Sequence, residues 1–280
     1  MSQALIIGCG DLGSSIASGL IDAGIDVTGV RISNKPVPSG VQLVQADVTN
    51  IRSLDAIKNL TPNILIYCVA ATAQTDENYH AHYVQGLKNI LQTVNNAQLQ
   101  HVFFVSSTRV YGQAGDDLLD ENVSAIPIDF GGVRLLEAEN VLKDYSSSST
   151  SLRLSGIYGA GRLRMINLAQ NTDNWPQTNT YSNRIHRDDA ARFVVFLSEK
   201  ALKNESLADC YIVTDSEPVS QYTVLNWIAE QLRHPKKLAP TITGGKRLYN
   251  QRMLSTGFQL NYPSYQSGYA KVIQALNCQK

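Results

Sequence analysis

An α/β fold with a parallel central sheet is the prediction from this sequence, and three observations support it. Short apolar segments alternate with segments of helical spacing over residues 1–155. The segment 64–70 is nearly all apolar, as expected for a strand covered on both faces. A glycine-rich turn, G-C-G-D-L-G at 8–13, joins the first apolar segment to the first helical one. This alternation implies right-handed crossovers, with helices on both faces of the sheet.

The individual elements follow from the same periodicities. Apolar runs bounded by turn residues predict strands from residue 4 into the glycine turn and at 26–31, 41–45, 64–70, 101–106 and 151–154. Helical spacing predicts helices at 12–23, 51–59, 79–97 and 134–145.

The regular alternation of strand and helix patterns ends after residue 155. Residues 156–184 are loop-rich, and later patterns predict a helix at 188–197, a strand at 210–214, an amphipathic helix at 220–232 and two further short helices. We therefore expect residues 1–155 and 186–215 to form the main domain. Residues 156–185 and 216–280 are expected to form a smaller lobe over a cleft at the strand ends.

Composition excludes several classes of function. Lys plus Arg and Asp plus Glu both number 24, so no global field attracts nucleic acid or an anionic membrane. No apolar run approaches the length of a membrane span, and the chain enters its first strand without the features of a signal peptide. The cysteines are far apart and form no metal-binding or redox pair, so we expect reduced thiols, no metal and a cytoplasmic protein.

The glycine turn carries the most specific signal. Between a strand and a helix, Gly8-x-Gly10-x-x-Gly13 is the dinucleotide fingerprint of a Rossmann-type doubly wound sheet. Gly8 permits the tight turn, Gly10 lets the backbone approach a pyrophosphate, and Gly13 lets helix and strand pack closely. The helix start at Asp11 and Leu12 offers N–H groups and its positive dipole end to phosphates. The alternative is a glycine-rich turn without a ligand.

Residues near the ends of the second and third strands bear on the choice of nucleotide. NAD-binding proteins place an acidic residue after the second strand, but this chain has Arg31 and Ser33 there. Arg31 would bind a 2′-phosphate, so we expect NADP in preference to NAD; alternatively, Arg31 is a solvated surface cation. Asp47, followed by Val48, either binds the adenine amino group or caps the helix at 51–59.

Several segments together resemble the extended short-chain dehydrogenase/reductase superfamily, in its NAD-dependent epimerase/dehydratase branch. The matching segments are G-C-G-D-L-G at 8–13, A-D-V at 46–48, V-S-S-T-R-V-Y-G at 105–112, L-R-L-S-G-I-Y-G-A-G-R at 152–162 and N-R-I-H-R-D-D-A-A at 183–191. The segment 246–254 is similar to an atypical bacterial subgroup. The resemblance implies a bound nicotinamide nucleotide, with Ala70 and Ala71 among its contacts, and a small-molecule substrate.

The resemblance also implies a Ser after the fifth strand and a Tyr-x-x-x-Lys pair on the next helix. Ser107 matches the Ser, although it can also serve only as a strand-end hydroxyl that satisfies nearby backbone. The Tyr-x-x-x-Lys pair is missing. One register places Asp129 and Val133 there, and the other places Phe130 and Arg134. Arg134 could replace the cationic role of Lys, but neither register supplies a phenol.

Other residues are candidates for the proton transfer and for the substrate. Tyr111, His186 or a bound water could replace the missing phenol; alternatively, His186 is a structural histidine. The substrate-binding candidates are Thr108, Arg109, Tyr158 and Arg162; Arg109 either binds an anionic substrate or faces solvent.

Three functions remain open at this stage. The chain is an NADP-linked oxidoreductase or epimerase acting on a small polar carbonyl or sugar-like compound, a catalytically inactive NADP(H)-binding sensor or regulatory protein, or a scaffold without nucleotide. The resemblance also suggests a homodimer formed through the helices near 79–97 and 129–145.

Overall fold

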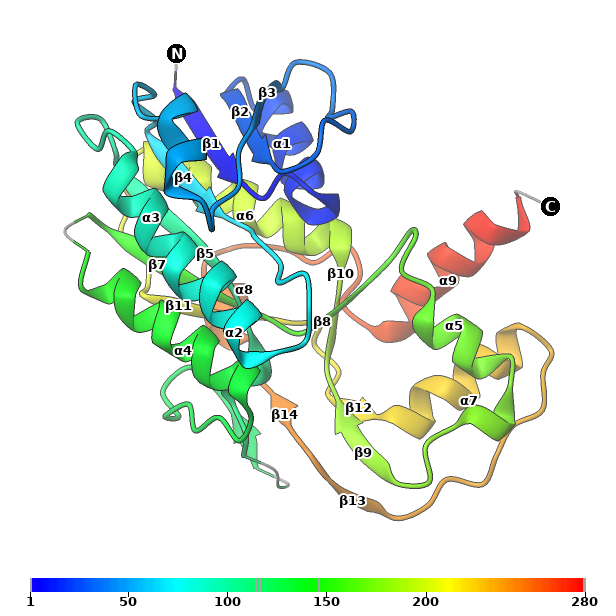
Figure 1. Cartoon of the computed structure of the whole chain (residues 1–280). Helices are drawn as coiled ribbons and strands as arrows, with labels where there is room; N and C mark the ends of the chain where they lie inside the picture. The colour runs from blue at the N-terminus through cyan, green and yellow to red at the C-terminus, as the bar shows by residue number, and fades with distance from the viewer. Residues whose placement is uncertain (1, 114, 116, 146, 279–280) are drawn as a thin grey trace. The chain divides into compact units, whose positions relative to one another are not determined.

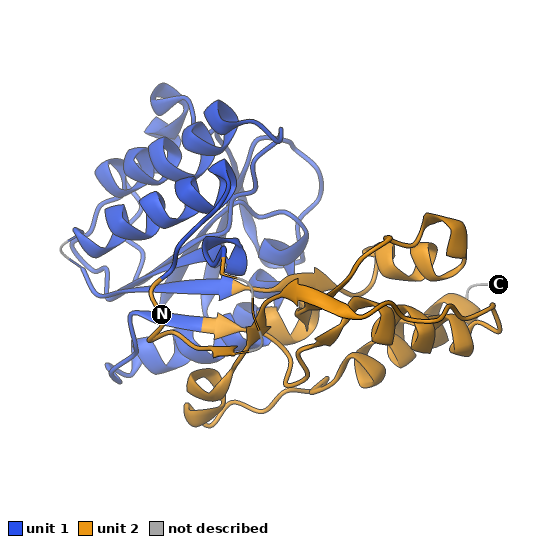
Figure 2. Cartoon of the chain, turned by 90° about the horizontal axis from the view of Figure 1, so that it is seen from below, with its two compact units in different colours: residues 1–112, 125–153, 191–211 blue, residues 113–124, 154–190, 212–280 orange. Residues whose placement is uncertain are grey.

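The computed structural model describes residues 2–113, 115, 117–145 and 147–278, and the chain divides into two compact units (Figure 2). Unit 1 comprises residues 1–112, 125–153 and 191–211. Unit 2 comprises residues 113–124, 154–190 and 212–280.

A seven-stranded sheet forms the centre of unit 1, and the last residues of two of its strands are grouped with unit 2. The strand order is β11-β7-β5-β4-β1-β2-β3 (Figure 1). The strands are β1 (Gln3–Ile7), β2 (Asp26–Arg31), β3 (Gln42–Gln45), β4 (Ile64–Tyr67), β5 (His101–Ser107), β7 (Ser149–Leu154) and β11 (Cys210–Val213). The pairings that join β3, β2, β1, β4 and β5 are all parallel. The predicted Rossmann-type α/β fold is confirmed.

The order of the strands creates a switch point beside β1. The chain runs from β1 through β2 to β3 at one edge and then returns to β4 on the other side of β1. Ligands of open α/β sheets bind at such points, beyond the carboxyl ends of the strands. A ligand site is therefore expected at the turns that follow β1 and β4.

Helices flank this sheet, and their bounds differ from the predicted ones for local reasons. They are α1 (Asp11–Asp22), the 3₁₀ turns η1 (Ile51–Ala56) and η3 (Thr108–Val110), α2 (Asp76–Tyr79), the π-helical turn η2 (His80–Gln85), α3 (Gly86–Thr93), α4 (Phe130–Lys143) and α6 (Arg187–Leu202). The α4 helix starts four residues before the predicted one because the Asp129 side chain accepts a hydrogen bond from the Gly132 N–H and caps it.

Two elements of unit 1 are less regular than their sequences suggest. The helix predicted at 51–59 is the 3₁₀ turn η1. The helix predicted at 79–97 is the continuous run α2–η2–α3, which begins at Asp76 and ends at Thr93. Its π-helical turn carries six residues and could not be read from spacing, because π turns are single irregular turns within otherwise α-helical segments.

Unit 2 contains more regular structure than the loop-rich sequence predicts. Its elements are β6 (Leu118–Leu119), β8 (Gly156–Tyr158), α5 (Arg164–Ala169), η4 (Thr172–Asn174), β9 (Asn179–Ser182), β10 (Arg184–His186), β12 (Val219–Ser220), α7 (Gln221–Gln231), β13 (Ile242–Gly245), β14 (Arg247–Leu248), α8 (Gln251–Ser255) and α9 (Tyr265–Asn277). The strands escape prediction because they are only two to four residues long, too short to show an alternating pattern.

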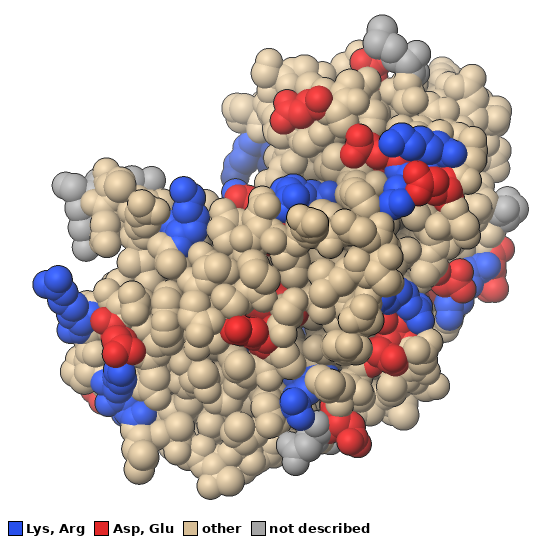
Figure 3. Space-filling model, turned by 180° about the vertical axis from the view of Figure 1, so that it is seen from behind, with Lys and Arg blue, Asp and Glu red and all other residues tan. Residues whose placement is uncertain are grey.

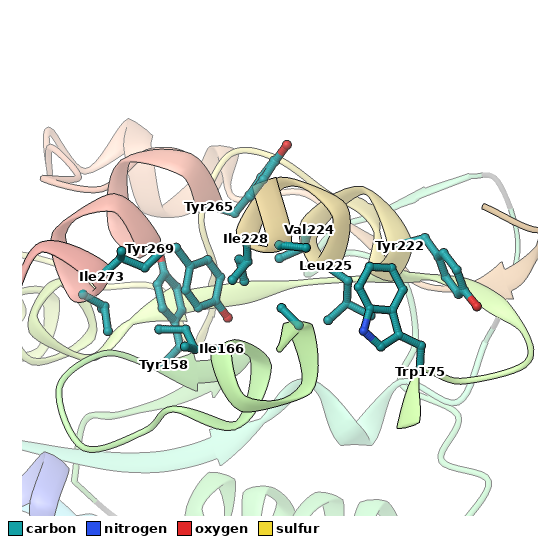
Figure 4. Packing of buried hydrophobic residues seen from close by; sticks show 13 residues of the cluster. Tyr158, Ile166, Trp175, Tyr222, Val224, Leu225, Ile228, Tyr265, Tyr269 and Ile273 are labelled. Atoms are coloured by element: carbon teal, nitrogen blue, oxygen red, sulfur yellow. The ribbon is translucent and has the colours of Figure 1, made fainter. Parts of the chain in front are cut away.

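An aromatic cluster forms the core of unit 2 (Figure 4). Tyr158 stacks on Tyr269 of α9 with their ring centroids 4.2 Å apart. Trp175 packs edge-on against Tyr222 of α7 at 5.4 Å. Apolar side chains of α7, including Val224, fill the space between these pairs.

Two further properties concern the described part of the chain as a whole. Among these residues no helix is both long enough and apolar enough to cross a bilayer. On the face shown in Figure 3, acidic and basic side chains lie interspersed in small groups.

Candidate functional site

The glycine turn after β1 is built by close backbone contacts. Gly8 has a φ of 94°, and a Cβ there would lie 2.5 Å from the carbonyl oxygen of Cys68. A Cβ on Gly13 would lie 2.4 Å from the carbonyl oxygen of Gly8. By contrast, the nearest atom to a Cβ on Gly10 is 3.9 Å away. Two glycines thus close the turn, while the third leaves its outer side open.

The turn leads directly into α1. Gly10 is the N-cap residue, and no side chain within the described residues caps this helix. The first helical amides and the positive end of the helix dipole form a group that binds phosphates. Asp11 is exposed and Leu12 is buried, so Leu12 can contribute only its backbone. An open cradle and an uncapped helix start fit the pyrophosphate of a dinucleotide.

The segment after β4 lies against this turn. β4 ends at Tyr67, and Gly8 packs on the Cys68 carbonyl that follows. Ala70 is exposed and Ala71 is half-buried. The segment that carries Ala70 and Ala71 thus leaves β4 beside the glycine turn, and their contact with a cofactor stays a prediction.

Arg31 and Ser33 lie at and just after the end of β2. Arg31 is half-buried at the end of β2, close enough for its charge to act on the thiol of Cys9 in the glycine turn. Burial raises the pKa of Cys9, and Ser14 and Arg31 act against that rise. Arg31 is thus positioned beside the turn, and Ser33 follows it with its side chain half-buried.

Asp47 does not cap the helix after β3. The cap of η1 is the side chain of Asn50, which accepts from the Arg52 N–H. Asp47 Oδ1 instead accepts from the N–H and hydroxyl of Thr49, at 2.9 and 2.7 Å. Val48 is buried, where a Cβ on Gly86 would lie 2.8 Å from it. The capping alternative for Asp47 is therefore wrong, and its role toward adenine stays a prediction.

Arg109 is held rigidly at the end of β5. Its Nε donates to the two Asp129 oxygens at 2.9 and 3.0 Å, and its Nη1 donates to the Tyr79 hydroxyl at 2.9 Å. Its guanidinium lies 5.2 Å from the ring centroids of both Tyr79 and Phe130. A Cβ on Gly131 would lie 2.4 Å from Arg109 Cζ, so the glycine makes room for the cation. Arg109 does not simply face solvent.

Electrostatics reinforce this arrangement. Burial acts to raise the pKa of Asp129, but the Gly132 N–H and the Arg109 guanidinium hold it below its usual range. Ser107 ends β5 with its side chain half-buried, and its Oγ accepts from the Arg109 N–H at 3.2 Å. The Ser107 hydroxyl thus satisfies nearby backbone and keeps its own proton for a further acceptor. The neighbouring Thr108 is buried.

Arg134 forms ion pairs with Asp76 and Glu137. Its guanidinium donates to both carboxylate oxygens of Asp76, at 2.8 and 2.7 Å, and to Glu137 at 2.8 Å. The hydrogen bond from Arg134 lowers the pKa of Asp76. The guanidinium links α4 to α2 by an ion-pair network, and this placement does not support its predicted cofactor role.

Tyr111 lies in the core of unit 1. Its side chain is fully buried, and its hydroxyl accepts from Arg153 Nη1 at 2.6 Å. Arg153 also pairs with Glu139 at 2.6 Å, and Glu139 accepts from Ser106 at 2.6 Å. This buried network joins distant segments and could not be predicted from residue spacing. Tyr111 is a member of it, which removes Tyr111 from the candidate proton donors.

Three predicted residues belong to unit 2. His186 is buried with Nδ1 accepting from the Asp188 N–H at 3.2 Å, and its ring lies 4.0 Å from that of Tyr262. Burial lowers the pKa of His186. Tyr158 is buried beside it, and Arg162 is exposed. His186 and Tyr158 are thus parts of an aromatic core.

Within the described residues, no group of three or more His, Cys, Asp or Glu side chains is arranged to hold a metal ion. The sheet order, the open glycine cradle and the uncapped α1 together define a Rossmann-type α/β protein with its ligand-binding edge at the switch point.

The family follows from the sequence comparison. The model of the NAD dependent epimerase/dehydratase family matches residues 4–208, so the chain belongs to this family. The predicted family is confirmed. By its description, this is a family of proteins that depend on a nicotinamide dinucleotide.

Individual relatives agree with this assignment. A structure from Methylobacillus flagellatus, assigned by name to the NAD-dependent epimerases/dehydratases, is 46% identical, covers 99% of each chain and has a TM-score of 0.91. The Thermus thermophilus UDP-glucose 4-epimerase, solved in complex with NAD, is 18% identical over 97% of this chain and 98% of that one, with a TM-score of 0.76. At that identity the likeness shows the fold alone.

A curated relative matches part of the chain. Protein YeeZ of Escherichia coli (strain K12) is 27% identical over 172 residues, which are 58% of this chain and 61% of that protein. The match therefore spans less than two thirds of its length.

Proposed function

We propose that this protein binds a nicotinamide dinucleotide at the glycine turn and catalyses a redox step on a small polar carbonyl or sugar-like compound, as an oxidoreductase or epimerase. The observation that carries the proposal is the cradle itself, in which Gly8 and Gly13 are closed by backbone while Gly10 stays open above the uncapped start of α1. When bound, the nicotinamide supplies or takes up hydride.

The residues beside the cradle support NADP as the preferred nucleotide. Arg31 and Ser33 stand where NAD-binding proteins carry a carboxylate, and the charge of Arg31 reaches Cys9 in the turn. A guanidinium at this place would form charge-assisted hydrogen bonds with a 2′-phosphate.

The end of β5 supports the substrate assignment. Ser107 has a hydroxyl proton to give to a substrate oxygen. Arg109 is fixed through Nε and Nη1, and among the described residues its Nη2 has no hydrogen-bond partner. A preorganised guanidinium with a spare donor suits a substrate that carries a carboxylate or phosphate.

Two assays on the purified chain test the proposal. Calorimetry with NADP, NADPH, NAD and NADH measures binding, and a panel of aldehydes, ketones and nucleotide sugars then measures NADPH oxidation. We expect binding with NADP preferred, and turnover of one class of the panel that carries an anionic group. A folded protein that binds none of the four nucleotides would overturn the proposal.

A second function is favoured by one observation, the occupation of Arg134. With Phe130 lacking a hydroxyl and Arg134 paired with Asp76 and Glu137, the family's usual proton donor and cation are absent from α4. A catalytically inactive NADP(H)-binding sensor would show this pattern. Binding without turnover across the whole panel supports the sensor, whereas stereospecific hydride transfer to any substrate rules it out.

A further inference from the structure

Proton transfer in the proposed reaction needs a phenol or an equivalent acid near the ends of β4 and β5. Phe130 cannot supply it, Tyr111 is enclosed with Arg153, and His186 is packed within the core of unit 2. The sequence motifs indicate no other tyrosine as the proton donor. Two tyrosines, Tyr79 and Tyr83, lie near the ends of β4 and β5. The Tyr79 hydroxyl already donates its proton to Gln74 Oε1 at 3.0 Å, whereas the Tyr83 hydroxyl has no proton acceptor among the described residues.

Tyr83 reaches the segment that follows β4. Its side chain is half-buried, and its hydroxyl oxygen accepts from the Ala71 N–H at 3.4 Å. β4 pairs with β5 in parallel, with Tyr67 opposite Phe104, so the segments after both strands leave the same edge of the sheet. Tyr83 therefore lies at the edge where Ser107 ends β5.

The backbone around Tyr83 is unusual. Tyr83 lies in the π-helical turn η2, where the Tyr67 hydroxyl donates to the carbonyl oxygen of His82. A π turn inserts one residue into a helix and redirects its side chains, and such turns occur frequently at functional sites. Here the turn is fixed from the sheet side by a hydrogen bond from a buried strand residue.

A cation accompanies this phenol. The rings of Tyr79 and Tyr83 lie 5.2 Å apart, and the Arg109 guanidinium lies on the same Tyr79 ring at 5.2 Å. The ionisable groups that act on Tyr83 are Tyr79, Cys68 and Arg109. Burial raises the pKa of Tyr83, while the Ala71 N–H and the charge of Arg109 act in the opposite direction because both stabilise a phenolate.

We propose that Tyr83 and Arg109 replace the missing phenol and cation, with Tyr83 as the proton donor of the proposed redox step. This inference rests on the proposed function. In the direction of carbonyl reduction, a bound reduced nicotinamide would be the reductant and would supply hydride to the substrate carbon. The carbonyl oxygen takes the proton of Tyr83 as the phenol O–H bond breaks. The electron pair stays on the phenolate, which regains a proton from water.

The test compares Tyr83→Phe with Tyr145→Phe, a matched variant whose hydroxyl has no hydrogen-bond partner within the described residues. First, calorimetry confirms that each variant binds NADP. Then the near-ultraviolet absorbance of tyrosinate is followed during pH titration, with and without saturating NADP. Because the oxidised nicotinamide ring is positively charged, NADP should lower the pH at which one phenol ionises in the wild type and in Tyr145→Phe.

Tyr83→Phe should lack that nucleotide-dependent transition, and Arg109→Met should shift it to higher pH. On a carbonyl compound that the wild type reduces, Tyr83→Phe should lower kcat by roughly 100-fold or more, the contribution typical of a general acid. A transition that persists in Tyr83→Phe, or is absent from a wild type that binds NADP, would overturn the inference. A wild type without nucleotide binding would instead overturn the proposed function and this inference together.

Discussion

Replacing Gly10 by alanine should separate nucleotide binding from folding. Gly10 has a φ of −90°, which L-residues adopt, and the nearest atom to an added Cβ is 3.9 Å away. The methyl group therefore fits the free protein. Since alanine also restricts the unfolded chain, the free energy of unfolding should stay unchanged or rise by up to about 1 kcal/mol.

Binding should respond differently, because the same methyl group stands on the open side of the turn. Loss of one or two charge-assisted hydrogen bonds to the pyrophosphate costs about 1.5–3 kcal/mol, which is roughly a 10-fold to 150-fold weaker Kd. Calorimetry with NADP measures the Kd, and thermal unfolding of the free variant measures stability.

Two other variants serve as controls for Gly10→Ala, one expected to destabilise the fold and one expected to be neutral. Gly13→Ala should destabilise the fold itself, because its Cβ would lie 2.4 Å from the Gly8 carbonyl oxygen. Ser18→Ala removes only a hydroxyl bonded to the Ser14 carbonyl within α1 and should leave both Kd and stability nearly unchanged. A Gly10→Ala protein that binds NADP as tightly as the wild type would refute the phosphate-cradle reasoning.

Three further outcomes are expected. Arg31→Glu should weaken NADP relative to NAD by about tenfold or more, as competition calorimetry would measure, and an unchanged preference would contradict the role of Arg31. Arg153→Met should lower the free energy of unfolding, measured in urea, by about 3–5 kcal/mol because Glu139, 1% exposed, loses its ion-pair partner. If the double variant Arg153→Met/Glu139→Leu recovers this stability, the loss is due to the unpaired charge of Glu139; no recovery would contradict that cause. Burial raises the pKa of Asp215 to about 7, whereas the pKa in the unfolded chain is about 4. The free energy of unfolding should therefore decrease as the pH rises from about 4 to about 7. Asp215→Asn should remove that loss, which the difference between the two pKa values puts at up to about 4 kcal/mol; equal pH dependence of urea unfolding in both proteins would contradict it.

The elements that sequence predicted well are those with local causes. The β1–turn–α1 unit follows from an apolar run, three glycines and helical spacing, and the structure places each as expected. β4 is wholly buried, as its apolar sequence required. The family motifs likewise located Ser107 at the end of β5.

The remaining features depend on contacts between distant segments. β6 pairs with β14, more than 120 positions later, and this pairing groups residues 113–124 with unit 2. The Arg109 cluster joins Tyr79, Arg109 and Asp129 from three separate segments, so spacing alone could not reveal it. By its spacing, Tyr83 is one of the buried residues on the inner face of a regular helix. Only the π turn and the contact with Ala71 distinguish it from the other residues of that face.

The most direct test of the account is a calorimetric titration of the purified, folded protein with NADP. The account predicts saturable heat for one nucleotide per chain, strongly reduced in Gly10→Ala and preserved in Ser18→Ala. Absence of heat with NADP, NADPH, NAD and NADH alike would contradict the claim that the turn after β1 binds a dinucleotide.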